Sequence, residues 1–140
     1  MRNGACCSSS GKRFWFGDCE LKWKFKSLIH RPEKIVKSLK RNRTLQSLTL
    51  DFNKIGNEGV AALVNSLKVN TNLQTLDLES TGISDEGGRM LIDLVKCNTT
   101  ILDITVMPGN KISEKTQEEI RNYLGLNKAA SSDKMVSTLK

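Results

Sequence analysis

The amino-acid sequence has a 28-residue period, and this repeat constrains the fold more than any other feature. The first half of each unit carries three aliphatic residues at matching positions: Leu45, Leu48 and Leu50; Leu73, Leu76 and Leu78; Ile101, Ile104 and Val106. The second half carries three more and an asparagine, after one inserted residue in the last unit: Ile55, Leu63, Leu67 and Asn70; Ile83, Leu91, Val95 and Asn98; Ile112, Ile120, Leu124 and Asn127. A period of about 20 to 50 residues is typical of repeat folds, so similar units are expected to stack.

Each unit combines two spacings. Apolar residues at alternate positions in the first half predict a short strand with one buried face. Apolar residues four apart in the second half, as at Leu63 and Leu67, predict one buried stripe of a helix. Neither element can bury its apolar face alone, so neighbouring units must stack strand on strand and helix on helix. The sequence predicts an α/β solenoid: a short horseshoe segment with parallel strands on its concave face and helices on its convex face.

Asparagine recurs at two places in the units. Asn53 follows the first predicted strand, where its amide can bond to unpaired backbone groups of the turn. Thr81 takes that place in the second unit and offers fewer bonds, whereas Asn110 restores the amide in the third. A further asparagine follows each predicted helix, and we interpret these residues as left-handed helix ends: Asn42, Asn70, Asn98 and Asn127.

A degenerate unit is expected ahead of the three clear repeats. A 29-residue shift places Phe16, Cys19 and Leu21 on the positions of Leu45, Leu48 and Leu50, and a helix is expected from Pro32. We therefore predict a repeat domain at 16–128, with a capping unit at 16–44 and repeats at 45–72, 73–100 and 101–128. Residues 1–15 form a basic segment with cysteines and serines, and residues 129–140 are expected to be a disordered tail.

The first complete unit matches a known repeat pattern. The matching residues of L-x-x-L-x-L-x-x-N-x-I-G-x-x-G-x-x-x-L-x-x-x-L-x-x-N are Leu45, Leu48, Leu50, Asn53, Ile55, Gly56, Gly59, Leu63, Leu67 and Asn70. This pattern resembles the leucine-rich repeats of the ribonuclease-inhibitor class over residues 42–128. The repeat domain also resembles those of tropomodulins, NLR-type receptors and centrosomal leucine-rich-repeat proteins. The resemblance implies a protein-binding domain, with a cytoskeletal role (actin, centrosome or cilium) as a minor alternative.

Residues for catalysis do not come together in the sequence. The only histidine is His30, the four cysteines lack metal-ligand spacing, and Gly56 with Gly59 does not make a phosphate loop. We expect no enzyme activity, no bound metal and no cofactor. No apolar run approaches the roughly 18 residues of a membrane span and no secretory signal is present, so a cytoplasmic protein is expected, with cytoskeletal association as an alternative.

The predicted concave face presents two columns of side chains between the buried leucines. Their members are Thr49 and Asp51, Asp77 and Glu79, and Thr105 and Met107, flanked on the turns by Phe52 and Ser80. The three carboxylates make the middle of this face acidic, which favours a protein partner with a basic patch. The predicted function is a non-catalytic scaffold or adaptor that binds a protein on this face.

A basic arm supports a rival interpretation. Residues 1–44 carry twelve Lys and Arg against three acidic side chains, whereas residues 45–128 carry eight against eleven. The alternative basic patch comprises Lys22, Lys24, Lys26, Lys37, Lys40 and Arg41. Such a patch, with Trp23 and Phe25 among its lysines, could bind nucleic acid or an anionic membrane. The simpler explanation is that the aromatic residues close the end of the solenoid while the lysines keep that end soluble.

The last predicted strand, near residues 101–106, has no following neighbour to cover its edge. A homodimer through this end would cover it. So would further repeats, if the chain is a short product of a longer repeat protein.

Overall fold

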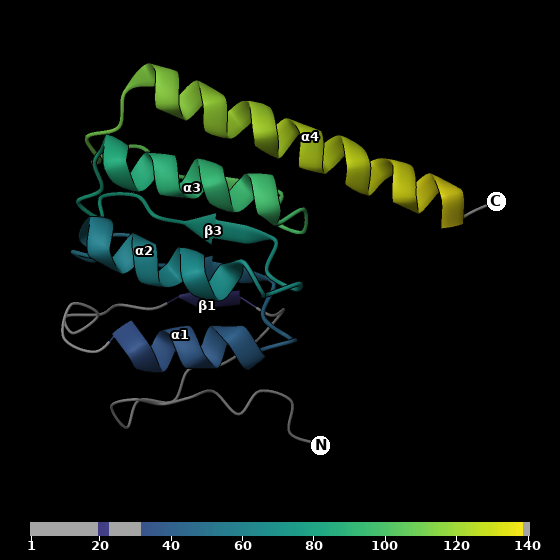
Figure 1. Ribbon diagram of the computed structural model, residues 1–140, viewed down its shortest axis with the longest axis horizontal. Coiled ribbons are helices and arrows are strands. Elements are labelled where there is room, and N and C mark those ends of the chain that lie inside the picture. The colour runs from purple at the N-terminus through teal and green to yellow at the C-terminus, as the bar shows by residue number, and fades with distance from the viewer. Residues whose placement is uncertain (1–19, 23–31, 139–140) are drawn as a thin grey trace.

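The computed structural model describes residues 20–22 and 32–138, in which short strands alternate with helices (Figure 1). The elements are β1 (Glu20–Lys22), α1 (Pro32–Arg41), β2 (Ser47–Thr49), α2 (Gly56–Leu67), β3 (Thr75–Asp77), α3 (Asp85–Cys97), β4 (Asp103–Thr105) and α4 (Glu114–Thr138). The four strands form one parallel sheet in chain order, and the helices stack beside it as a second layer (Figure 1). The predicted α/β solenoid is confirmed.

The sheet register follows the sequence period in the clear repeats. Ser47 pairs with Thr75, and Thr75 pairs with Asp103, so each step repeats the 28-residue offset of the sequence. The degenerate unit differs, because Leu21 pairs with Leu48 and not with Leu50 as the 29-residue shift predicted. A slip of two residues preserves the alternation of faces, so the apolar pattern alone could not distinguish the two registers. Phe16 and Cys19 lie outside the described residues.

The core lies between the sheet and the helices. All eighteen aliphatic residues that define the three repeats are buried, and none of them is more than 7% exposed. Each apolar stripe meets the stripes of the units before and after it, which is why a single unit could not be stable alone.

The asparagines that follow the helices bind consecutive units together. The Asn70 side chain donates from Nδ2 to the carbonyl of Leu39 (2.7 Å) and accepts at Oδ1 from the N–H of Leu73 (2.9 Å). Asn98 repeats this arrangement one unit later, donating to the carbonyls of Leu67 (2.6 Å) and Asn70 (2.8 Å). The predicted left-handed conformation is wrong for all four asparagines (Asn42, Asn70, Asn98 and Asn127), because none has a positive φ; the backbone of Asn98 is extended (φ −109°, ψ 110°). These buried amides close helix ends through hydrogen bonds to the neighbouring unit and do not need a left-handed backbone.

The hydrogen bonds of the turn after each strand change where Thr81 takes the place of Asn53. The Asn53 amide donates to the carbonyls of Leu50 and Asp51, whereas the Thr81 hydroxyl donates to one backbone carbonyl, that of Leu78 (2.7 Å), and more distantly to Asn110 Oδ1 (3.4 Å). Asn110 compensates from the next unit, because its Oδ1 accepts from the backbone N–H groups of Thr81 and Ile83, at 3.0 Å each. The second turn is therefore satisfied by its neighbour.

Helix α4 overturns the expectation of a disordered tail. It runs from Glu114 to Thr138, and its last turns project beyond the ends of the other helices (Figure 1). No Gly or Pro interrupts residues 126–138, and Ala129 and Ala130 favour helix, so the helix continues past Asn127. None of the helices in the described residues is long and apolar enough to cross a membrane.

Helix α4 carries a polar residue at a position where α2 and α3 carry buried apolar residues. Val64 and Ile92, at matching positions of α2 and α3, are buried, but the matching residue of α4 is the exposed Arg121. A polar outer side is typical of a terminal capping unit. The homodimer is expected through the edge of the last strand, β4, and it stays a prediction.

Candidate functional site

The strand register assembles the two predicted columns on the sheet. Thr49, Asp77 and Thr105 are direct neighbours across β2, β3 and β4. The pairing continues beyond the strands, because the N–H of Leu50 donates to Asp77 O (2.9 Å) and the N–H of Phe52 donates to Glu79 O (3.0 Å). Asp51 therefore lies beside Glu79 and forms the start of the second column.

The third unit departs from this regular pairing. The N–H of Ser80 donates to the carbonyl of Pro108 (2.9 Å), although the uninterrupted register would bring it to Met107. The chain therefore takes up its extra residue between Thr105, which is still in register, and Pro108. Met107 is 38% exposed, so it still presents its thioether side chain at the end of the column.

Exposure divides the predicted site residues into three groups. Thr49 is only 9% exposed, so its expected exposure is wrong. Five residues are half-buried: Asp51, Asp77, Glu79, Ser80 and Thr105. Phe52 and Met107 are the exposed apolar members of the face.

The three carboxylates of the face have no cationic partner within the described residues. The salt bridges Lys96–Glu119 and Lys128–Asp103 involve none of the three, although Asp103 lies two residues before Thr105 on β4 and therefore on the same side of the sheet. Asp77 accepts the backbone N–H of Glu79 at Oδ1 (3.1 Å), which orients one carboxylate. Asp51 and Glu79 are like charges on neighbouring strands, an arrangement that costs stability. The face is therefore acidic and uncompensated.

Phe52 combines two unfavourable features. Its φ is 57°, a left-handed value that bulky side chains rarely adopt, and its side chain is 75% exposed. Ser80 holds the same conformation in the next unit, with φ 52°, so the turn geometry is a property of the repeat. An exposed ring contributes little to the core, and nothing in the fold requires an aromatic residue at this turn.

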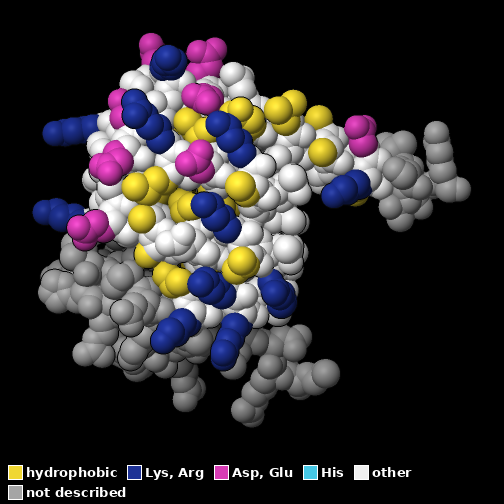
Figure 2. All heavy atoms as spheres, viewed as in Figure 1, with side chains coloured by type: hydrophobic (Ala, Val, Ile, Leu, Met, Phe, Trp, Pro, Cys, Tyr) yellow, Lys and Arg dark blue, Asp and Glu magenta, His cyan; other side chains and the backbone are white. Residues whose placement is uncertain are grey.

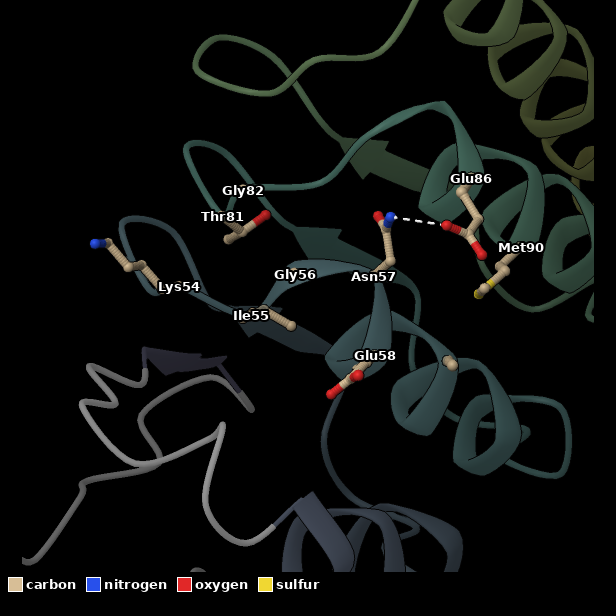
Figure 3. Close-up of a pocket in the computed structure, with 10 residues that line it drawn as sticks. Lys54, Ile55, Gly56, Asn57, Glu58, Thr81, Gly82, Glu86 and Met90 are labelled. Carbon is tan, nitrogen blue, oxygen red and sulfur yellow. Dashed lines mark hydrogen bonds between the residues drawn. The ribbon is translucent and has the colours of Figure 1, made fainter.

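A groove lies elsewhere, at the N-terminal ends of α2 and α3 (Figure 3). Its volume is about 710 Å³, and its lining includes Ala61, Met90, Glu58 and Glu86. Asn57 donates to Glu86 Oε2 (3.2 Å) and to Ser84 Oγ (2.7 Å) across the two units. The groove contains none of the predicted site residues, and no cluster of three or more His, Cys, Asp or Glu that could hold a metal occurs in the described chain.

The rival basic patch is only partly described. Lys22 belongs to β1, Lys24 and Lys26 lie outside the described residues, and Lys37, Lys40 and Arg41 are exposed on α1. Lys68 is not among the predicted residues, although it lies one repeat period after Lys40 at the end of the adjacent helix. The repeat period itself was the signal that could have found it.

The comparisons with known proteins agree with this architecture. A family model described as "Leucine Rich repeat" matches residues 41–64 and 69–91. The matched residues, with the parallel strands and stacked helices, identify a leucine-rich-repeat fold. No curated protein matches the sequence.

Two solved structures share the fold. One is leiomodin-1 actin-binding site 2, with a TM-score of 0.55, 18% identity, and coverage of 76% of this chain and 77% of that one. The other is the C-terminal domain of tropomodulin from Caenorhabditis elegans, with a TM-score of 0.51, 12% identity, and coverage of 76% and 81%. At these identities the likeness establishes the fold alone.

Proposed function

We propose that this domain is a non-catalytic protein-binding scaffold whose partner docks on the concave face. The observation that carries this proposal is the exposed, left-handed Phe52 beside the acidic column. Its conformation costs roughly 1–2 kcal/mol relative to a residue that tolerates positive φ, and its exposed ring returns no burial energy. Aromatic residues of this kind are frequent anchors in protein interfaces.

The charge of the face defines the partner's chemistry. Asp51, Asp77 and Glu79 lie within one short stretch of the sheet without counter-ions in the described chain, so a basic patch on a partner would relieve their repulsion. Phe52 and Met107 supply apolar contacts at two ends of the same surface. The partner is therefore a protein with basic side chains between two apolar contact points.

The test is recovery of bound proteins from cell extract on the purified chain, with nuclease treatment, followed by binding titrations with the purified partner. The Asp51→Lys, Asp77→Lys double variant should abolish a nuclease-resistant interaction. A matched control is Asp93→Lys with Glu118→Lys, which changes the same charge at exposed helix positions and should bind as the wild type does. Equal binding by both variants, or binding that nuclease removes, would contradict the proposal.

Actin is the second candidate, because one structure that shares this fold is an actin-binding site of leiomodin-1. Its test is direct: co-sedimentation with filaments and titration of labelled monomers. Binding to either form that disappears in the concave-face double variant supports actin as the partner. Binding to neither form removes it. An actin partner would place the protein on the cytoskeleton.

We also propose that the repeats are of the ribonuclease-inhibitor subclass. The support is the 28-residue spacing and the full helix in each clear unit, at α2, α3 and α4. The subclass itself does not specify a partner.

A further inference from the structure

Five cations gather where α1 and α2 end, and we call this surface the basic corner. Its members are Lys37, Lys40, Arg41, Arg43 and Lys68, all of them exposed. The Asn70 amide brings the two helix ends together, because it donates to the carbonyls of Leu39 (2.7 Å) and Asn42 (3.2 Å). Figure 2 shows Lys and Arg gathered over the lower helices, whereas Asp and Glu gather toward the upper left.

Among the side chains that the structure describes, none of these cations has an acidic partner: the salt bridges Lys96–Glu119 and Lys128–Asp103 do not involve the basic corner. The acidic residue of α2 is Glu58, in its first turn, at the opposite end of the helix. Lys96 continues the column one repeat period after Lys68, but it is engaged by Glu119 (3.9 Å) and lies over the Tyr123 ring (5.0 Å). The unpaired charge therefore ends at Lys68.

Helix stability explains only part of this arrangement. Lys40 and Arg41 lie in the last turn of α1, where a positive charge complements the helix dipole. Arg43 lies beyond the end of α1. Val69, which follows Lys68 in the sequence, is an exposed aliphatic residue, with 52% of its surface accessible. A cationic cluster with an exposed aliphatic residue needs another cause.

We propose that the basic corner binds an anionic membrane surface. Clusters of about four to eight Lys and Arg attract acidic headgroups, and an aliphatic side chain can enter the boundary between headgroups and acyl chains. Single-stranded nucleic acid is the weaker fit, because bases stack on aromatic rings and the five cations and Val69 include none. This surface is formed by helix ends, so it leaves the concave face available to a protein.

The test is co-sedimentation of the full chain with vesicles of phosphatidylcholine alone or with phosphatidylserine added. Binding should require phosphatidylserine and should weaken with salt. Replacing Lys40, Arg41 and Lys68 together by Gln should lower the partition coefficient about a hundredfold, at about fivefold per residue. The control replaces Lys54, Lys111 and Lys115 by Gln, which removes the same charge from exposed positions elsewhere and should have a much smaller effect.

Three outcomes would overturn the inference. One is an equal loss of vesicle binding in the two triple variants, because both variants keep residues 1–31 and remove the same charge from different surfaces. Another is absence of vesicle binding. The third is binding of a single-stranded oligonucleotide by the same corner without binding of vesicles. Val69→Ser should weaken vesicle binding at high salt, where the apolar contact carries more of the affinity, and an unchanged affinity there would exclude insertion of this side chain.

Discussion

Asp51 and Glu79 lie side by side on neighbouring units, held there by the hydrogen bond from the Phe52 N–H to the Glu79 carbonyl (3.0 Å). Neither carboxylate has a cationic partner in the described chain, so the backbone ladder forces two like charges together. A fold selected only for stability would not keep this pair. The pair leads directly to a test.

Neutralising one member of the pair should stabilise the fold. We expect Glu79→Gln to raise the free energy of unfolding by about 0.5 kcal/mol, because like charges on adjacent strands repel. The measurement is urea denaturation at low salt, and the gain should shrink as salt screens the pair. The exposed Asp93→Asn is the control, because its neighbours three and four residues away on α3 are the cations Lys96 and Arg89, so no gain is expected. A loss of stability would mean that the pair is compensated.

Phe52 separates stability from binding. Phe52→Asn should leave the free energy of unfolding unchanged or raise it by up to about 1 kcal/mol, since Asn tolerates φ 57° better than Phe does. The same variant should weaken partner binding on the concave face by at least about 2 kcal/mol if Phe52 is an anchor, at roughly the hot-spot threshold. Chemical denaturation and a binding titration measure the two effects. A clear loss of stability would instead indicate a packing role.

Asn98 tests the hydrogen bonds between units. Asn98→Ala removes its bonds to the Leu67 and Asn70 carbonyls and leaves buried backbone groups unpaired. We expect a loss of about 2–3 kcal/mol. Asn65→Ala, at an exposed position of α2, should change stability by no more than about 0.5 kcal/mol. Thermal or urea unfolding of the pair provides the comparison.

Two glycines should respond to the same substitution in opposite directions. Gly109 has φ +88°, and an added Cβ would lie 2.8 Å from the Ser80 Cα, so Gly109→Ala should destabilise the fold by about 1–3 kcal/mol. Gly125 lies inside α4 with open space around it, so Gly125→Ala should stabilise the helix by about 1 kcal/mol. Helical circular dichroism should also increase. A destabilised Gly125→Ala variant would contradict the continuous α4.

Asp85 should make the stability of the fold depend on pH, with stability lost at low pH. Its Oδ1 accepts the N–H of Ser113 (2.7 Å), and this hydrogen bond holds the pKa of Asp85 below its ordinary value of 3.8. A lowered folded-state pKa stabilises the fold above about pH 4, and the contribution is lost as the pH falls through the folded-state pKa. The stability difference between the wild type and Asp85→Asn should therefore be largest at neutral pH and shrink below about pH 4. Urea midpoints across this range measure it, and a constant difference would contradict the assignment.

The 28-residue period alone determined most of the architecture. It set the order of strands and helices, identified the buried positions and aligned Asp51 with Glu79, because a stacked repeat converts sequence spacing directly into spatial neighbours. The tertiary structure decided what a period cannot encode. Leu21 pairs with Leu48 and not with Leu50. Either register would keep the same side chains of β1 facing the core, so the sequence pattern does not choose between them and packing does.

Burial and helix ends likewise depended on neighbours outside the local pattern. Thr49 is buried, whereas Asp77, its neighbour at the equivalent position of β3, is half-buried, although the same alternation predicted both to be exposed. Asn98 bonds to carbonyls of the previous unit, so its role depends on a contact that is distant in the sequence. Lys68 lies one repeat period after Lys40, and the Asn70 amide, which donates to the Asn42 carbonyl, brings the ends of α1 and α2 together. Sequence periodicity predicts which residues repeat, and packing determines what each repeated residue touches.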